Sequence, residues 1–258
     1  MVRVTAPQAV LAAAAFCVGA CIGSFMNVVI HRLPLGESIV RPGSRCPACG
    51  RPIRARENVP LLSFALLGGR CAGCRGKIPW RYPVVEAMTG AGYALIVLAG
   101  GPVALMARDL VFFSLLVPIA AIDIDHRIIP DALSLGGVAA GLLFSLLPGG
   151  DWKGSLAGGI LGGAVLYGTA FAYEKSTGRE GMGGGDVKLI AMIGTFLGWR
   201  GALLTIFLGS VFGVAGGVLA MRRGGEGLKT AIPFGPYLCA AALASRYLGY
   251  NIWNLLGM

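Results

Sequence analysis

The chain has 258 residues and a formal net charge of +10, with 55% hydrophobic and only 13% charged residues. Soluble domains carry about 25% charged residues, so this composition excludes an ordinary soluble domain. It also excludes a disordered chain, because disorder requires low hydrophobicity. The composition therefore predicts an all-α polytopic membrane protein.

Eight apolar segments are candidates for membrane-spanning helices, each of which needs about 20 apolar residues. In chain order they cover residues 8–30, 83–101, 108–122, 132–148, 155–173, 187–199, 202–220 and 231–248. The first could be mistaken for a signal peptide, but its apolar run is long and leads into a polar motif rather than a cleavage site. We therefore predict about eight transmembrane helices, with the first in residues 1–30.

A small polar domain is expected between the first two spans, in residues 31–82. This segment holds ten of the 22 Lys and Arg residues and four of the seven cysteines, but only two acids, Glu37 and Glu57. The remaining residues, 83–258, are expected to form a transmembrane core.

The distribution of basic residues predicts the orientation of the chain. If residues 31–82 are cytoplasmic, 17 Lys and Arg residues lie on the cytoplasmic side and five on the other side. The positive-inside rule then favours this topology, with both termini outside. In a soluble protein the basic charge would indicate a nucleic acid partner. Here we assign it to topology and to contact with anionic lipid headgroups, and we expect no nucleic acid partner.

Two Cys-x-x-Cys pairs, Cys46–Cys49 and Cys71–Cys74, predict a zinc site. Two such pairs can present four thiolates tetrahedrally to Zn²⁺, and four ligands leave no position open for a substrate. The metal is therefore expected to be structural and to fold a segment that is too small for its own core. The alternative is two disulfides, which a reducing cytoplasm disfavours. The other cysteines lie in apolar spans and are assigned no role: Cys17, Cys21 and Cys239.

Carboxylates at the edges of two apolar spans are candidates for catalysis. Asp123, Asp125 and Asp131 follow the run 110–122, and Asp186 follows a glycine-rich stretch. Acids at membrane depth are functional candidates, and two brought together can serve as acid and base. The glycines before Asp186 would let a substrate backbone approach. The alternative is that these acids are ordinary loop residues, with Asp131 as a helix N-cap. Phosphate binding by the glycines is also conceivable, but the Walker spacing is absent.

The sequence resembles the type IV prepilin peptidases. Gly-Met-Gly-Gly-Gly-Asp at 181–186 and Asp-x6-Pro-Asp at 123–131 resemble that family's two catalytic motifs. Further segments resemble its N-terminal signature and the surroundings of its cysteines, at residues 23–34, 57–63, 69–71 and 81–86. The matches keep their order from about residue 20 to about residue 190.

The resemblance implies a GxGD-type intramembrane aspartic protease of the bacterial inner membrane. Such enzymes cleave the leader of prepilins of type IV pili and pseudopilins of type II secretion at the cytoplasmic face, and many methylate the new N-terminus with S-adenosylmethionine. Asp123, seven residues before Pro130, and Asp186 take the two catalytic places, whereas Asp125 does not. The family's methyltransferase function is associated with the cytoplasmic domain, but no motif predicts which residues bind the methyl donor.

Two alternative functions remain open at this stage. One is a peptidase without methylation. The other is a proton-coupled transporter with a regulatory zinc domain, whose relay acids would lie near mid-span rather than at one membrane edge. We further expect a set of glycines at helical spacing to support close helix packing, within the bundle rather than between subunits. They are Gly158, Gly159, Gly162 and Gly163. Gly185 is expected to keep the substrate path open, unless it only supplies a positive φ.

Overall fold

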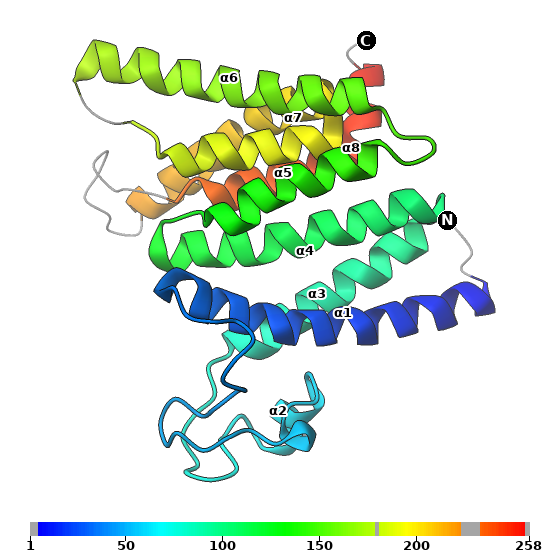
Figure 1. Ribbon diagram of the computed structural model, residues 1–258, viewed down its shortest axis with the longest axis vertical. Coiled ribbons are helices and arrows are strands. Elements are labelled where there is room, and N and C mark those ends of the chain that lie inside the picture. Colours follow the sequence, from blue (N-terminus) through cyan, green and yellow to red (C-terminus); the bar gives the residue numbers. More distant parts are fainter. Residues whose placement is uncertain (1–4, 179–180, 223–232, 256–258) are drawn as a thin grey trace. The chain divides into compact units, whose positions relative to one another are not determined.

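The computed structural model describes residues 5–178, 181–222 and 233–255, and these ranges are helical with loops and without any named β-strand (Figure 1). The prediction of an all-α protein is confirmed. Each of the eight predicted apolar segments coincides largely with a helix. Residues 100–101, 146–148 and 233–234 lie beyond the helix ends, and residues 231–232 are outside the described ranges.

The chain divides after Pro118 into two compact units, residues 1–118 and 119–258. The first unit contains α1 (Ala6–Arg32), η1 (Leu33–Leu35), η2 (Ala55–Glu57), α2 (Leu62–Leu66), α3 (Arg81–Ala99) and most of α4 (Val103–His126). The second contains the last turns of α4, together with α5 (Asp131–Ser145), α6 (Trp152–Thr177), α7 (Gly184–Arg222) and α8 (Gly235–Leu255).

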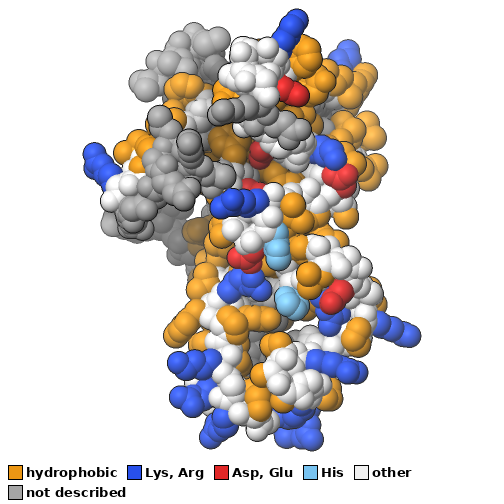
Figure 2. Space-filling model, turned by 90° about the vertical axis from the view of Figure 1, so that its left-hand side faces the viewer, with side chains coloured by type: hydrophobic (Ala, Val, Ile, Leu, Met, Phe, Trp, Pro, Cys, Tyr) orange, Lys and Arg blue, Asp and Glu red, His pale blue; other side chains and the backbone are white. Residues whose placement is uncertain are grey.

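In the described ranges, five helices are long and apolar enough to cross a membrane, namely α1, α3, α4, α6 and α7, and α5 is a shorter apolar helix of 15 residues. Large apolar side chains are exposed along these helices, among them Leu11, Leu95, Phe207 and Val214. Figure 2 shows many such side chains on the surface, whereas Lys and Arg gather at its lower end. Exposed apolar surface of this extent suits lipid rather than water. The chain is a multi-pass membrane protein.

Glycines bring α1 and α3 into close contact in the first unit (Figure 1). A Cβ at Gly23 of α1 would lie 2.8 Å from Cα of Glu86, and one at Gly19 would lie 2.8 Å from the carbonyl oxygen of Thr89. Neither distance is tolerable for a side chain, so the helices can approach this closely only because these residues are glycines. This contact places Glu86 directly against α1.

In the second unit, α7 packs against α5, α6 and α8. A Cβ at Gly158 of α6 would overlap the carbonyl oxygen of Gly194, and one at Gly162 would lie 3.2 Å from the carbonyl oxygen of Ile190. The predicted packing of these glycines within the bundle is therefore confirmed. Gly198, with φ 71° and ψ 179°, interrupts α7 and separates the sixth and seventh predicted spans.

The predicted N-cap role of Asp131 is wrong. Pro130 occupies the N-cap position of α5, and Asp131 is the first helical residue. The Asp131 carboxylate instead accepts a hydrogen bond from Nζ of Lys188 at 2.6 Å, which connects the first turns of α5 and α7. The positive end of the helix dipole still stabilises the Asp131 carboxylate, because Asp131 lies in the first turn of α5.

Candidate functional sites

Asp123 lies in the last turns of α4 and is only 5% exposed. Its Oδ2 accepts a hydrogen bond from the backbone N–H of Gly235 at 2.9 Å. Gly235 is the first residue of α8, where backbone N–H groups have no partner inside the helix. The N-terminus of α8 therefore holds one oxygen of the Asp123 carboxylate in place.

Asp186 is the third residue of α7 and is partly buried. It lies near enough to Asp123 for the two carboxylates to interact electrostatically. The two aspartates come from motifs more than 60 residues apart, yet the second unit places them together at the ends of their helices. Asp125 is exposed and Asp131 pairs with Lys188. The arrangement is thus a pair of carboxylates suited to acid–base chemistry.

The glycine-rich stretch is partly helical, since α7 begins at Gly184. A Cβ at Gly184 would meet no atom within 4 Å, and one at Gly183 would have Oδ2 of Asp186 at 3.9 Å and a backbone nitrogen at 4.0 Å as its nearest neighbours. Gly185 does not have positive φ, so that explanation of its identity is wrong. A Cβ there would lie 3.1 Å from Cβ of Ile129. Gly183 and Gly184 therefore leave space beside Asp186, whereas Gly185 permits tight packing of α7 against Ile129.

Sequence reasoning missed two residues of this site, Gly235 and Cys239. A Cβ at Gly235 would lie 2.7 Å from Oδ2 of Asp123, so only glycine allows the observed approach. Cys239, one turn further along α8, is buried and lies within electrostatic reach of both aspartates. Pro236, immediately after Gly235, is the available sequence signal, because proline favours the first turn of a helix.

The two cysteine pairs form two similar turns in the first unit. In the first turn, the backbone N–H of Cys46 donates to the carbonyl oxygen of Arg51, and the N–H of Gly50 donates to the carbonyl oxygen of Cys46. In the second turn, the N–H of Cys71 donates to the carbonyl oxygen of Gly76, and the N–H of Arg75 donates to the carbonyl oxygen of Cys71. The residue after each pair has positive φ, 69° at Gly50 and 60° at Arg75. This conformation is ordinary for glycine and uncommon for arginine.

The four thiols have the geometry that a tetrahedral zinc site requires. Their sulfur atoms all lie within 4.8 Å of one another, and Sγ of Cys46 is 3.9 Å from Sγ of Cys74. Zn–S bonds of about 2.3 Å in a tetrahedron place sulfurs about 3.8 Å apart. The four cysteines are free thiols rather than disulfides. Backbone N–H groups of Cys74 and Gly73, with the Cys46 thiol, lower the pKa of Cys71 to about 6. The thiolate, which is the form that binds metal, is thereby favoured at Cys71, whereas the Cys49 thiol and burial raise the pKa of Cys74 to about 11.

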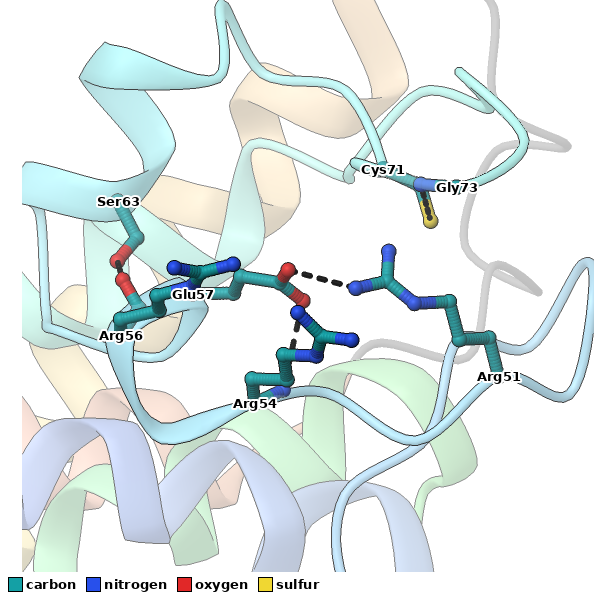
Figure 3. Close-up of polar contacts among 7 residues, drawn as sticks. All are labelled: Arg51, Arg54, Arg56, Glu57, Ser63, Cys71 and Gly73. Carbon is teal, nitrogen blue, oxygen red and sulfur yellow. Dashed lines mark hydrogen bonds and ion pairs between the residues drawn. The ribbon is translucent and has the colours of Figure 1, made fainter.

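An ion pair stabilises the loops around the cysteines (Figure 3). The Glu57 carboxylate accepts a hydrogen bond from Nη2 of Arg51 at 2.6 Å and one from the backbone N–H of Arg54 at 3.4 Å. The hydrogen bond from Arg51 lowers the pKa of Glu57. The Arg51 stem also lies beside Gly73, where a Cβ would be 3.1 Å from its Cδ. Arg51 thereby connects the first cysteine turn to both the second turn and η2.

These features define a multi-pass membrane protein with a carboxylate pair at the helix ends and a four-cysteine cluster in a loop segment. The chain belongs to the type IV leader peptidase family. The model of that family matches residues 110–218, and that of the bacterial peptidase A24 N-terminal domain matches residues 17–99. Asp123 and Asp186 lie within residues 110–218, and the four cysteines lie within residues 17–99.

Similar curated proteins carry the name prepilin leader peptidase/N-methyltransferase. The one from Aeromonas salmonicida strain A449 is 36% identical, over 91% of this chain and 90% of that protein. The one from Pseudomonas aeruginosa is 38% identical, over 91% of this chain and 89% of that protein. The one from Myxococcus xanthus is 41% identical over 82% of this chain, but the match spans only 63% of that longer protein. No solved structure matches the chain.

Proposed function

We propose that the chain cleaves the leader peptide of prepilins and pseudopilins and then methylates the new N-terminal amine. The observation that carries the proposal is the pairing of Asp123 with Asp186 inside the region matched to the leader peptidase family. The shared name of the relatives supports both activities in this chain, rather than cleavage alone.

In the proposed cleavage, one aspartate accepts a proton from water while the water oxygen attacks the scissile carbonyl carbon. The other aspartate donates a proton to the carbonyl oxygen, and the peptide C–N bond then breaks as a proton passes to the leaving nitrogen. The N–H of Gly235 fixes the orientation of Asp123 during these steps. The open space beside Gly183 and Gly184 admits the substrate backbone to Asp186.

The site is placed at the cytoplasmic face of the bacterial inner membrane in this proposal. The basic segment between α1 and α3 is assigned to the cytoplasm by the positive-inside rule. Asp123 lies near the end of α4 and Asp186 near the start of α7, rather than at mid-helix. This position suits cleavage at a membrane edge and disfavours the alternative of a proton relay in a transporter. A substrate with an apolar helix would arrive from the lipid.

Zinc is assigned a structural role, with Cys46, Cys49, Cys71 and Cys74 as its ligands. The sulfur separations support this assignment. When bound, Zn²⁺ supplies four strong bonds to a loop segment that has few buried apolar residues of its own.

S-adenosylmethionine, when bound, supplies an electrophilic methyl group. Methylation of the new N-terminus would require the amine of the cleaved substrate to lie beside the bound donor and to lose one proton. The chain must therefore hold the donor and accept hydrogen bonds from the amine.

The test uses purified full-length chain in lipid nanodiscs with a prepilin peptide and methyl-labelled S-adenosylmethionine. Cleavage is scored by the mass of the product, and methylation by label in the mature fragment. We expect both products. Cleavage without label would leave a peptidase alone, and the absence of both would favour the transporter alternative.

A further inference from the structure

A segment without charge interrupts the basic loop region between α1 and α3. Residues 58–69 contain no Lys, Arg, Asp or Glu, although residues 31–82 contain ten Lys and Arg residues. The segment includes α2, and it is followed by the second cysteine turn and then by Trp80. Large apolar side chains that gather on a protein surface mark a contact with another apolar surface. The exposure of this segment therefore indicates what surrounds it.

The burial pattern of α2 is the reverse of that of a helix in water. Its one hydroxyl side chain, Ser63, is buried at 7% exposure and donates to the carbonyl oxygen of Arg56 at 3.1 Å (Figure 3). Leu62 and Leu66, one helical turn apart, are instead 55% and 77% exposed. A surface helix in water directs its apolar side chains inward and its polar side chains outward. The exposed leucines of α2 thus indicate apolar surroundings.

The large exposed apolar side chains of α3 lie on one face. Val84, Met88 and Leu95 are exposed, and their spacing of four and seven residues places them on the same side of a helix. Because α3 is long and apolar enough to cross a membrane, this stripe is expected to face lipid. Trp80, four residues before Val84, extends the stripe at the start of α3 and is 73% exposed.

Two contacts attach α2 to this end of α3. The rings of Phe64 and Trp80 pack with their centroids 5.0 Å apart. The backbone N–H of Leu61, just before α2, donates to Oε2 of Glu86 at 2.8 Å, and Glu86 is buried in the second turn of α3. These contacts fix α2 beside the first two turns of α3, at the depth where the membrane-spanning helix begins.

Basic side chains border this apolar surface. Arg54 and Arg56 precede α2 and Arg70 follows it, and all three are exposed. The one acid between Arg54 and Arg70, Glu57, already pairs with Arg51, so the border is positively charged. An apolar centre with a tryptophan and a basic border suits the boundary between lipid headgroups and acyl chains. The positive charge further favours anionic lipids.

We propose that Leu62, Leu66 and Trp80 form a membrane-docking surface, which inserts into the lipid leaflet around the start of α3. The inference requires only a chain that spans a membrane, and it does not depend on the proposed enzymatic function. Lipid is favoured over a protein partner because the surface continues the stripe of α3 and has a basic border. The second cysteine turn lies between Leu66 and Trp80 in the chain, so docking holds that turn at the membrane surface.

The experiment introduces the photoreactive residue benzoylphenylalanine at single positions of the full-length chain, in nanodiscs of phosphatidylglycerol and phosphatidylcholine in equal amounts. Leu62 and Leu66 test the docking surface, Leu95 on α3 is the lipid-facing reference, and Glu37 is an exposed control in the same loop region. Circular dichroism verifies that the variants fold, and mass spectrometry measures attached lipid after irradiation. We expect at least about fivefold more lipid adduct at Leu62 and Leu66 than at Glu37, with phosphatidylglycerol prevailing.

A second measurement uses Trp80 as a reporter, in a chain whose other three tryptophans are replaced by phenylalanine. Lipid brominated near the headgroup should quench the fluorescence of Trp80. The double variant Leu62→Ser with Leu66→Ser should reduce this quenching at least about twofold, because two of the three inserted side chains become polar. Val40→Ser, which changes another exposed apolar residue of the same loop region, should leave the quenching unchanged.

Three results would overturn the docking surface. The first is a lipid adduct at Leu62 and Leu66 no greater than at Glu37, while Leu95 is labelled. The second is a crosslink to an added prepilin peptide, to a second chain or to another segment of the same chain in place of lipid, which would assign the surface to that protein contact. The third is the absence of lipid adducts at Leu95 as well, since the stripe of α3 would then not face lipid.

Discussion

At the scale of single residues, the contact between Gly235 and Asp123 shows how narrow the tolerances of the carboxylate pair are. Oδ2 of Asp123 lies 2.9 Å from the backbone nitrogen of Gly235 and would lie 2.7 Å from a Cβ at that position. A side chain at position 235 would push Oδ2 of Asp123 away, so this hydrogen bond requires glycine there.

We predict that Gly235→Ala lowers kcat for leader cleavage at least about tenfold, equivalent to about 1.4 kcal/mol of transition-state stabilisation. The new methyl group must push Asp123 or the start of α8 away, so the carboxylate pair loses its geometry. Gly249→Ala is the matched control, because a Cβ there would meet its nearest atoms at the ordinary distances of 3.5 and 3.9 Å. Wild-type kcat for Gly235→Ala would show that this contact does not position the carboxylate.

The sequence motifs were sufficient to single out Asp123 and Asp186 as candidates, because each aspartate stands in a distinctive local pattern, and the structure brings the two within electrostatic reach of each other. They could not reveal Gly235, which lies 112 positions from Asp123 and contacts it only after the second unit has folded. The same limit explains the error at Asp131, whose side chain finds Lys188 on another helix instead of its own backbone.

At the scale of helices, glycines set the distance between α6 and α7. The backbones of Gly158 and Gly194 are in direct contact, and a Cβ on either would overlap the other. Lipid provides little hydrophobic driving force between helices, so close packing of this kind is a main source of their association.

Gly158→Leu should therefore destabilise the bundle, by about 1–3 kcal/mol if the helices can partly separate. Gly168→Leu on the same helix is the control, since a Cβ at Gly168 would meet no atom within 4 Å. Thermal unfolding in nanodiscs measures both variants. Equal melting temperatures would contradict the packing described here.

Removal of zinc should loosen the loops between α1 and α3 while the long helices remain folded. We expect one zinc per chain in freshly purified reduced protein, and a strong loss of metal in Cys74→Ser. Chelation should then increase proteolysis within residues 33–80 without a large change in helical circular dichroism. Cys17→Ser, outside the cluster, serves as the control. Metal-free wild-type protein with protected loops would contradict the assignment.

The helices were predictable because apolar segments of sufficient length have few alternatives in a membrane. The division of residues 187–220 into two spans was also predictable, since Gly198, with φ 71° and ψ 179°, interrupts α7 between them. The turn at Arg75 was hidden, because positive φ at an arginine has no sequence signal.

At the scale of the whole molecule, the two units divide the proposed chemistry. The carboxylate pair lies in residues 119–258, and the cysteine cluster lies in residues 1–118. The proposed cleavage residues and the proposed zinc ligands therefore belong to different units.

This division predicts that Asp123→Asn still methylates a synthetic pilin peptide that already has the mature N-terminus. In the proposed reaction, methyl transfer requires the methyl donor and a free amine, but not the carboxylate pair. Label incorporation into the pre-cleaved peptide is measured beside wild type, with an uncleaved peptide as the blank. A complete loss of labelling in a folded Asp123→Asn protein would mean that the two activities share this residue.

The most direct test of the account is leader cleavage by three asparagine variants, each purified in nanodiscs and matched for zinc content and melting temperature. Asp123→Asn and Asp186→Asn each remove one member of the carboxylate pair, whereas Asp125→Asn changes an exposed acid two residues from the first. We expect no detectable cleavage from Asp123→Asn or Asp186→Asn, and cleavage near the wild-type rate from Asp125→Asn. Normal cleavage by Asp123→Asn or by Asp186→Asn would contradict the central claim that these two carboxylates perform the hydrolysis.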